Sequence, residues 1–302
     1  MKLGIAVVYL VKEENEPLLD LHLAQIEKHT SVPYTIYGSA NRLLPSLRAK
    51  IEKNPRITIC DIPTSTARSS AEHAYYLDAL LKVAVDEGAT HLATMHVDSF
   101  PVKDGWVEEL DGQLDERTVL AGVMREEVND DKPHPSLVFF TTEFYREYSP
   151  RILGSDEDRE SSAFKRYLEE VGCLDDGGVG LGFKIHSEGL SWVKLTRSNK
   201  ADDHYTMGSV YGDVTFHLGA AARDNKVFIG DALTEDMSPT RRRVQLMGRK
   251  VLGLFPQSMQ DFVIRHYFSA HKENQVVHDE VRSELFDDPD GYLRYLRTGE
   301  RD

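Results

Sequence analysis

The chain has few cysteines and no long uncharged apolar run, and both shortages restrict the classes of protein to which it can belong. Its two cysteines, Cys60 and Cys173, fit neither a disulfide framework nor a zinc site of cysteine pairs, so we expect reduced thiols in a cytoplasmic protein. No segment reaches the about 18 apolar residues that a membrane-spanning helix requires. The apolar run at residues 2–10 lacks a small-residue cleavage site after it and does not predict a signal peptide.

Positive charge is also scarce. The 36 Lys and Arg residues stand against 50 Asp and Glu residues, which gives a net charge of −14. Such a chain has no global positive field to attract phosphates, so we expect no nucleic-acid partner. An acidic protein that handles an anionic substrate needs a metal ion or a local cluster of Arg and Lys. The apolar fraction of 40% and the 302 residues suffice for one large or two smaller globular domains.

The order of apolar and amphipathic segments predicts an α/β fold. Strand patterns alternate with helix patterns at short intervals, which is typical of a mostly parallel, Rossmann-like sheet with helices on both faces. In such sheets ligands bind at the carboxyl ends of the strands. We expect strands at 2–10, 34–41, 56–63, 90–97, 118–124 and 190–197 and within 211–223, a strand leading into a helix at 135–147, and helices at 16–30, 44–54, 69–88 and 163–174. The stretch 175–189 starts with turn residues and is expected to continue into a helix that ends at Gly189.

A histidine and an aspartate mark the end of the fourth predicted strand, in "ATHLATMHVDSFPVKDGW" (89–106). Alternate residues of a strand point to the same face, so His96 and Asp98 are expected to lie together. An imidazole and a carboxylate on one face can ligate a divalent cation or hold a sugar hydroxyl. The alternative is that Asp98 only caps the turn that follows.

The same stretch resembles the central segment of family-2 type glycosyltransferases with the GT-A fold. In that family an apolar strand ends in Asp-x-Asp, followed by an aromatic-Pro pair and by a Gly-Trp pair that opens a helix. The resemblance covers roughly residues 3–225, and the chain departs from the pattern where a histidine replaces the first aspartate. The matching residues are His96-Val97-Asp98, Phe100-Pro101 and Gly105-Trp106.

This resemblance implies a GT-A catalytic domain at 1–230, with a donor half at about 1–105 and an acceptor half at about 106–230. A helical, more basic extension would follow at 231–302. It also implies an inverting, metal-dependent enzyme that moves a sugar from a UDP- or GDP-sugar to the hydroxyl of a saccharide or a lipid-linked acceptor. Charge builds on the leaving nucleoside diphosphate, and a bound Mn²⁺ or Mg²⁺ would offset that charge.

Further site residues follow from the matching regions of the family. His217 would be a second protein ligand to the metal beside Asp98, with a histidine of the core as the alternative. Asp176, or otherwise Asp175, would be the general base that takes the proton from the acceptor hydroxyl. Capping of the helix expected at 175–189 is the competing explanation for both aspartates.

Four residues lie where the family has positions that bind the nucleotide, namely Ser39, Asn41, Glu72 and His73. Glu72 and His73 begin a predicted helix, where Glu72 could equally form a capping box with Ser69 or Ser70 as the N-cap. Ser39 and Asn41 lie where the family usually places an acidic residue that reads the nucleobase, so the preferred base stays open.

The basic stretch at 238–268 has three interpretations. It could pack its apolar side on the catalytic domain, rest on an anionic membrane surface as a peripheral contact, or close over the substrate as a lid. The lid residues would be Arg241, Arg242 and Arg243.

Two other functions compete with a glycosyltransferase. A sugar nucleotidyltransferase would need a Gly-rich basic loop after the first strand, where the chain reads "VKEENE" (11–16). A non-catalytic sugar-nucleotide binder is suggested by His96 in place of aspartate.

Overall fold

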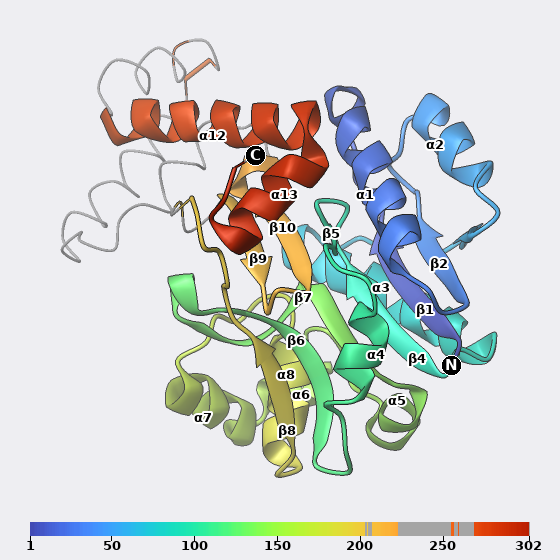
Figure 1. Ribbon diagram of the computed structural model, residues 1–302. Helices are drawn as coiled ribbons and strands as arrows, with labels where there is room; N and C mark the ends of the chain where they lie inside the picture. The colour runs from blue at the N-terminus through green and yellow to red at the C-terminus, as the bar shows by residue number, and fades with distance from the viewer. Residues whose placement is uncertain (203, 205–206, 223–254, 257–258, 260–268, 302) are drawn as a thin grey trace.

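A seven-stranded sheet forms the centre of the protein (Figure 1). The computed structural model describes all residues except 203, 205–206, 223–254, 257–258, 260–268 and 302. The strand order is β3-β2-β1-β4-β7-β6-β8, and only β7 runs antiparallel to its neighbours, so the predicted mostly parallel α/β sheet is confirmed. The strands are β1 (Leu3–Val8), β2 (Tyr34–Ser39), β3 (Ile57–Ile59), β4 (His91–Met95), β6 (Thr118–Arg125), β7 (Asp130–Thr141) and β8 (Ser191–Leu195).

Helices cover both faces of this sheet because its strands are apolar on both sides. Alternate residues of β1 enter two different core clusters, Ile5 in one and Ala6 in the other. The first cluster includes α1 (Glu16–His29), α2 (Pro45–Glu52) and α4 (Trp106–Asp111). The second includes α3 (Ser69–Asp86), α5 (Thr142–Tyr148) and α8 (Val179–Ser187). Two short helices, α6 (Asp156–Glu160) and α7 (Ser162–Val171), lie before α8 in the chain.

A second, three-stranded antiparallel sheet lies beside the carboxyl end of β4. Its order is β5-β10-β9, with β5 (Ser99–Pro101), β9 (Met207–Tyr211) and β10 (Thr215–Gly219). In its register His217 pairs with Ser99, although the two residues are far apart in the sequence. This pairing places β10 and His217 beside the carboxyl end of β4, where ligands are expected.

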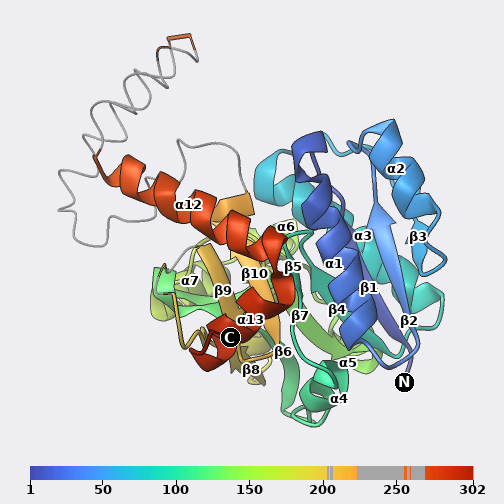
Figure 2. The same cartoon turned by 45° about the horizontal axis from the view of Figure 1, so that its top comes forward.

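Two C-terminal helices, α12 (Ser269–Asp287) and α13 (Pro289–Thr298), pack against the small sheet (Figure 2). Arg297 pairs with Asp213 at 2.7 Å and donates a hydrogen bond to the carbonyl oxygen of Val102 at 2.9 Å. Apolar residues of both helices belong to the same core cluster as α1. Helical structure predicted after residue 231 is therefore present, while the division at residue 230 stays a prediction.

Two predictions concern a lid and a membrane contact in the C-terminal part of the chain. The proposed lid residues Arg241, Arg242 and Arg243 lie outside the described residues. Among the helices that the structure describes, none is long and apolar enough to cross a membrane.

One half-buried carboxyl group gives a test of the packing in this fold. Asp78 of α3 accepts a hydrogen bond from the backbone N–H of Ile152 at 2.9 Å. Burial raises the pKa of Asp78 from 3.8 to about 6, and the hydrogen bond and the charge of Arg151 oppose this only in part. Because the pKa is higher in the folded chain than in the unfolded chain, the ionised carboxylate destabilises the fold above about pH 6, and this cost fades as the pH falls toward 3.8.

We therefore expect Asp78→Asn to raise the free energy of unfolding at pH 7.5 by about 1–2 kcal/mol. This is less than the pKa shift of Asp78 alone would give, because the side chain is only half-buried and solvent screens its charge. The asparagine keeps an oxygen to accept from Ile152. Urea unfolding at pH 7.5 and pH 4.5 measures the effect, and the variant should gain less stability on acidification than the parent chain. Asp86→Asn, at an exposed position of the same helix, is the control. An equal or lower stability of Asp78→Asn at pH 7.5 would contradict the expectation.

Candidate functional site

A tightly bonded turn follows β4 and carries the two predicted ligands. The strand ends at Met95, so His96 and Asp98 are brought together by a turn, and the expected same-face placement on a strand is wrong. The hydroxyl of Ser99 accepts from the backbone N–H of His96 at 2.9 Å and donates to the carbonyl oxygen of Ser136 on β7 at 2.5 Å. The imidazole of His22 on α1 donates through Nδ1 to the carbonyl oxygen of Ser99 at 2.9 Å. The turn is thus closed by its own hydrogen bond and held by two other elements, β7 and α1.

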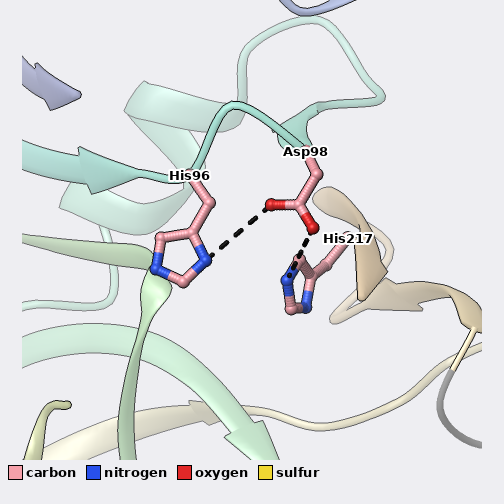
Figure 3. A group of neighbouring side chains, drawn as sticks. All are labelled: His96, Asp98 and His217. Atoms are coloured by element: carbon pink, nitrogen blue, oxygen red, sulfur yellow. Dashed lines mark ion pairs between the residues drawn. The ribbon is translucent and has the colours of Figure 1, made fainter. Parts of the chain in front are cut away.

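Asp98 lies between two imidazoles, as Figure 3 shows. Its Oδ2 is 3.5 Å from Nε2 of His217, and its Oδ1 is 3.8 Å from Nδ1 of His96. One ligand atom from each of these three residues lies within 4.8 Å of the others. His217 arrives from β10, whose backbone at Leu218 also donates to the carbonyl oxygen of Asp98 at 2.8 Å. The structure therefore brings all three predicted metal ligands together.

The protonation states of Asp98 and His96 suit a cation. Burial alone would raise the pKa of Asp98, but the charge of His217 and its hydrogen bond hold that pKa well below its usual range. Burial, helped by the charge of His73, holds the pKa of His96 well below its ordinary 6.5, against the opposing charge of Asp98. An ionised carboxylate and a neutral imidazole are the forms that bind metal ions.

The donor atoms of the triad also fit a divalent ion. Each imidazole turns one nitrogen toward the carboxylate of Asp98, His96 its Nδ1 and His217 its Nε2. Two imidazole nitrogens and one carboxylate form a common donor set for divalent transition metals.

Two more histidines surround the triad. The ring of His73, at the start of α3, lies 4.8 Å from the ring of His96 in an edge-to-face contact. The ring of His134 on β7 lies 5.3 Å from that of His96 and 5.4 Å from that of His217. Burial lowers the pKa of His73 to about 4 and holds that of His134 well below 6.5. Sequence reasoning missed His134, because its ring neighbours His96 and His217 come from segments that are distant in the sequence.

The two candidate bases have different surroundings. Oδ1 of Asp176 lies 2.7 Å from Nζ of Lys132, a fully buried lysine that also pairs with Asp130. The carboxylate of Asp175 is held by both terminal nitrogens of Arg159, at 2.7 and 2.9 Å. Lys132 was not predicted, and it lies two residues before His134 on the same strand.

Neither aspartate caps a helix. Helix α8 begins at Val179, with Gly178 as its N-cap and no side-chain cap, so the turn expected at the start of 175–189 is confirmed and the capping role of the two aspartates is wrong. A β-carbon at Gly178 would meet the carbonyl oxygen of Pro133 at 1.7 Å, and the φ of Gly178 is +95°. Glycine at this position therefore lets the loop of Asp176 approach β7 closely.

The predicted nucleotide-side residues are grouped at the ends of β2 and α3. Ser39 is buried at the end of β2, and the Nδ2 of Asn41 donates to the carbonyl oxygen of Ile62 at 2.8 Å. Glu72 pairs with Arg42 at 2.7 Å, and the N-cap of α3 is Arg68, so the capping-box alternative for Glu72 is wrong. Within this group, His73 contacts the triad through His96.

Comparison with known proteins gives matches in structure only. No protein-family model matches the chain, and no curated protein matches it in sequence. Mouse xyloside xylosyltransferase 1 in its apo form shares 12% identity with a TM-score of 0.42, over 65% of this chain and 85% of that one. The galactosyltransferase LgtC, solved with donor and acceptor sugar analogues, shares 10% identity with a TM-score of 0.37, over 65% and 73%.

A cytidylyltransferase from Leptospira borgpetersenii shares 11% identity with a TM-score of 0.40, over 70% of this chain and 81% of that one. Two of these three proteins are glycosyltransferases, the class that the sequence resemblance implies. At such identities and TM-scores the likeness carries no argument on activity, and the side chains of the site have to supply one.

Proposed function

We propose that the protein is a metal-dependent, inverting glycosyltransferase, which moves a sugar from a nucleotide-diphospho-sugar to an acceptor hydroxyl. The convergence of His96, Asp98 and His217 at the carboxyl end of β4 carries this proposal. The site lies at the edge of a mostly parallel sheet, where such folds bind their ligands. The sequence pattern around Asp98 supports a sugar-nucleotide donor.

The triad would hold a divalent cation, Mn²⁺ or Mg²⁺ by the resemblance. When bound, this ion would offset the charge that develops on the leaving nucleoside diphosphate. Asp98 offers a carboxylate oxygen, and His96 and His217 offer imidazole nitrogens. The turn that Ser99 and His22 fix keeps these donors in place before substrate arrives, which lowers the cost of organising the site.

Asp176 is the general base in this proposal. As the acceptor oxygen attacks the anomeric carbon, the carboxylate of Asp176 takes the hydroxyl proton and the nucleoside diphosphate leaves from the opposite side, which inverts the anomeric centre. Lys132 keeps this carboxylate oriented at 2.7 Å. Asp175 is a poorer candidate because Arg159 occupies both of its oxygens.

Ser39, Asn41, Glu72 and His73 would line the nucleotide of a UDP- or GDP-sugar, and the acceptor would be a saccharide or a lipid-linked sugar. A donor half at about 1–105 and an acceptor half at about 106–230 belong to the same proposal. A nucleotidyltransferase is not favoured, because β1 is followed by an acidic segment with the short 3-10 helix Glu13–Asn15.

Binding of nucleoside diphosphates tests the proposal. We expect thermal stabilisation by UDP or GDP in the presence of Mn²⁺, and a much smaller effect of either compound with EDTA. The matching nucleotide-sugar should then slowly release free nucleoside diphosphate through transfer to water. Failure of every nucleoside diphosphate to bind at millimolar concentration with Mn²⁺ would refute the proposal. Tight binding without any turnover of the donors, with or without saccharide acceptors, would indicate a non-catalytic binder.

A further inference from the structure

A loosely paired arginine ends β6. The guanidinium of Arg125 makes no hydrogen bond to the part of the chain that the structure describes. Its Nε lies 3.7 Å from Oε1 of Glu127, which is an ion pair but is too long for a hydrogen bond. The side chain of Arg125 is 28% exposed, so a ligand can reach it. The N–H donors of this guanidinium are therefore available to a substrate.

Glu127 has another partner that keeps it from closing on Arg125. Its Oε1 accepts a hydrogen bond from the hydroxyl of Tyr211 on β9 at 2.5 Å, and its side chain is only 7% exposed. Three other cations near the site each have a carboxylate oxygen at 2.7 Å, namely Arg42, Lys132 and Arg159. Of these four cations, Arg125 can turn to a substrate without leaving a carboxylate that it contacts closely.

The strand register places Arg125 beside the histidines of the site. Val123, two residues earlier on β6, pairs with His134 on β7. The ring centre of His134 lies 5.3 Å from that of His96 and 5.4 Å from that of His217. After burial, the charge of Arg125 is the largest cause that lowers the pKa of His134, and it adds to the effect of burial on the pKa of His96. The guanidinium thus lies close enough to act on both rings.

His134 supplies a neutral donor next to this cation. The backbone N–H of Ser136 donates to its Nδ1 at 3.3 Å, so the proton of the neutral ring is on Nε2. This Nε2–H makes no hydrogen bond to a described group. A ring nitrogen that carries a proton cannot bind a metal ion, but it can donate to an oxygen. His134 therefore suits an anion that binds beside the cation.

We propose that Arg125 and His134 bind a phosphate group of the substrate next to the cation of the Asp98 triad. The inference rests on the proposed function and deepens it, because this phosphate would belong to the nucleoside diphosphate of the donor. The planar fork of a guanidinium matches two phosphate oxygens, and an imidazole N–H adds a neutral donor. Such a pair supplies local positive charge in a chain whose net charge is −14.

Calorimetric titration of the full chain with inorganic pyrophosphate and Mn²⁺ tests this pair without turnover. We expect Arg125→Gln to weaken pyrophosphate binding by about 10–100-fold, because charge-assisted hydrogen bonds are lost. Arg125→Lys keeps the charge but not the fork, so its affinity should lie between those of the parent chain and Arg125→Gln. His134→Ala should weaken binding by about 2–10-fold, since it removes a neutral donor. Arg146→Gln, at an exposed arginine of α5, is the matched control.

Titration of Mn²⁺ alone separates phosphate binding from mere support of the site. The Mn²⁺ affinity and the unfolding temperature of Arg125→Gln should not fall, while its affinity for UDP or GDP should fall as that for pyrophosphate does. Unchanged pyrophosphate and nucleoside diphosphate affinities in Arg125→Gln, or an equal loss of Mn²⁺ affinity, would overturn the inference and leave the proposed function standing. Pyrophosphate binding that depends on Arg125, in a chain that binds no nucleoside diphosphate, would refute the proposed function and leave the phosphate site.

Discussion

Asp98→Ala is expected to remove cation-dependent binding of the nucleoside diphosphate and, with it, transferase activity. Asp98 is the only carboxylate in the described triad, and it contacts both imidazoles of that triad. Its loss should lower cation affinity by more than the about 10–100-fold that follows from removing a residue that only orients a ligand. Calorimetry with Mn²⁺, followed by UDP or GDP titration, measures both steps.

The fold of the Asp98→Ala variant should persist, because Asp98 belongs to a turn whose bonds are made by Ser99 and by backbone groups. Asp104→Ala is the control, since Asp104 is an exposed aspartate a few residues further along that pairs with His29. Asp98→Asn keeps the shape of the side chain and isolates the contribution of its charge. Undiminished turnover of Asp98→Ala, or of the parent chain in excess EDTA, would refute a metal-dependent reaction.

The layer architecture could be predicted from sequence because it depends on local periodicity. Apolar runs and amphipathic segments alternate along the first hundred residues, and the corresponding strands and helices are present. The ends of these elements were harder to predict. β4 ends at Met95 because the hydroxyl of Ser99 bonds to His96 and to Ser136 of β7, which turns the chain. α8 begins at Val179 because Gly178 packs closely on Pro133. Both boundaries depend on contacts that no short sequence window contains.

The site was predictable only in part, for the same reason. His96 and Asp98 are neighbours in sequence, so strand and turn patterns suffice to group them. His217 was assigned through the family resemblance, and the pairing of β10 with β5 explains how it reaches them. His134 and Lys132 gave no signal, since a histidine between two prolines and a lysine directly after two aspartates are typical of a surface segment. Lys132 is nevertheless fully buried, with two carboxylates around it.

The scarcity of positive charge in the sequence has a structural counterpart near the site. Arg42 is paired with Glu72, Arg159 with Asp175, and Lys132 with Asp130 and Asp176. These cations already have carboxylate partners, so recruiting any of them to a diphosphate would leave a carboxylate behind. A metal ion at Asp98 avoids this cost, because it brings positive charge from outside the chain.

Asp176→Asn is expected to slow sugar transfer by about 10²–10⁴-fold with little change in donor affinity, because it removes a general base and leaves the cation site intact. The amide oxygen of asparagine can still lie beside Nζ of Lys132, and Asp130 keeps the buried ammonium paired. Transfer rates at saturating donor, together with calorimetric donor affinity, separate the two effects. Asp175→Asn should stay near the parent rate, since Asp175 only pairs with Arg159 at the surface. If Asp176→Asn keeps its rate and loses donor affinity, Asp176 binds substrate and the base is another residue.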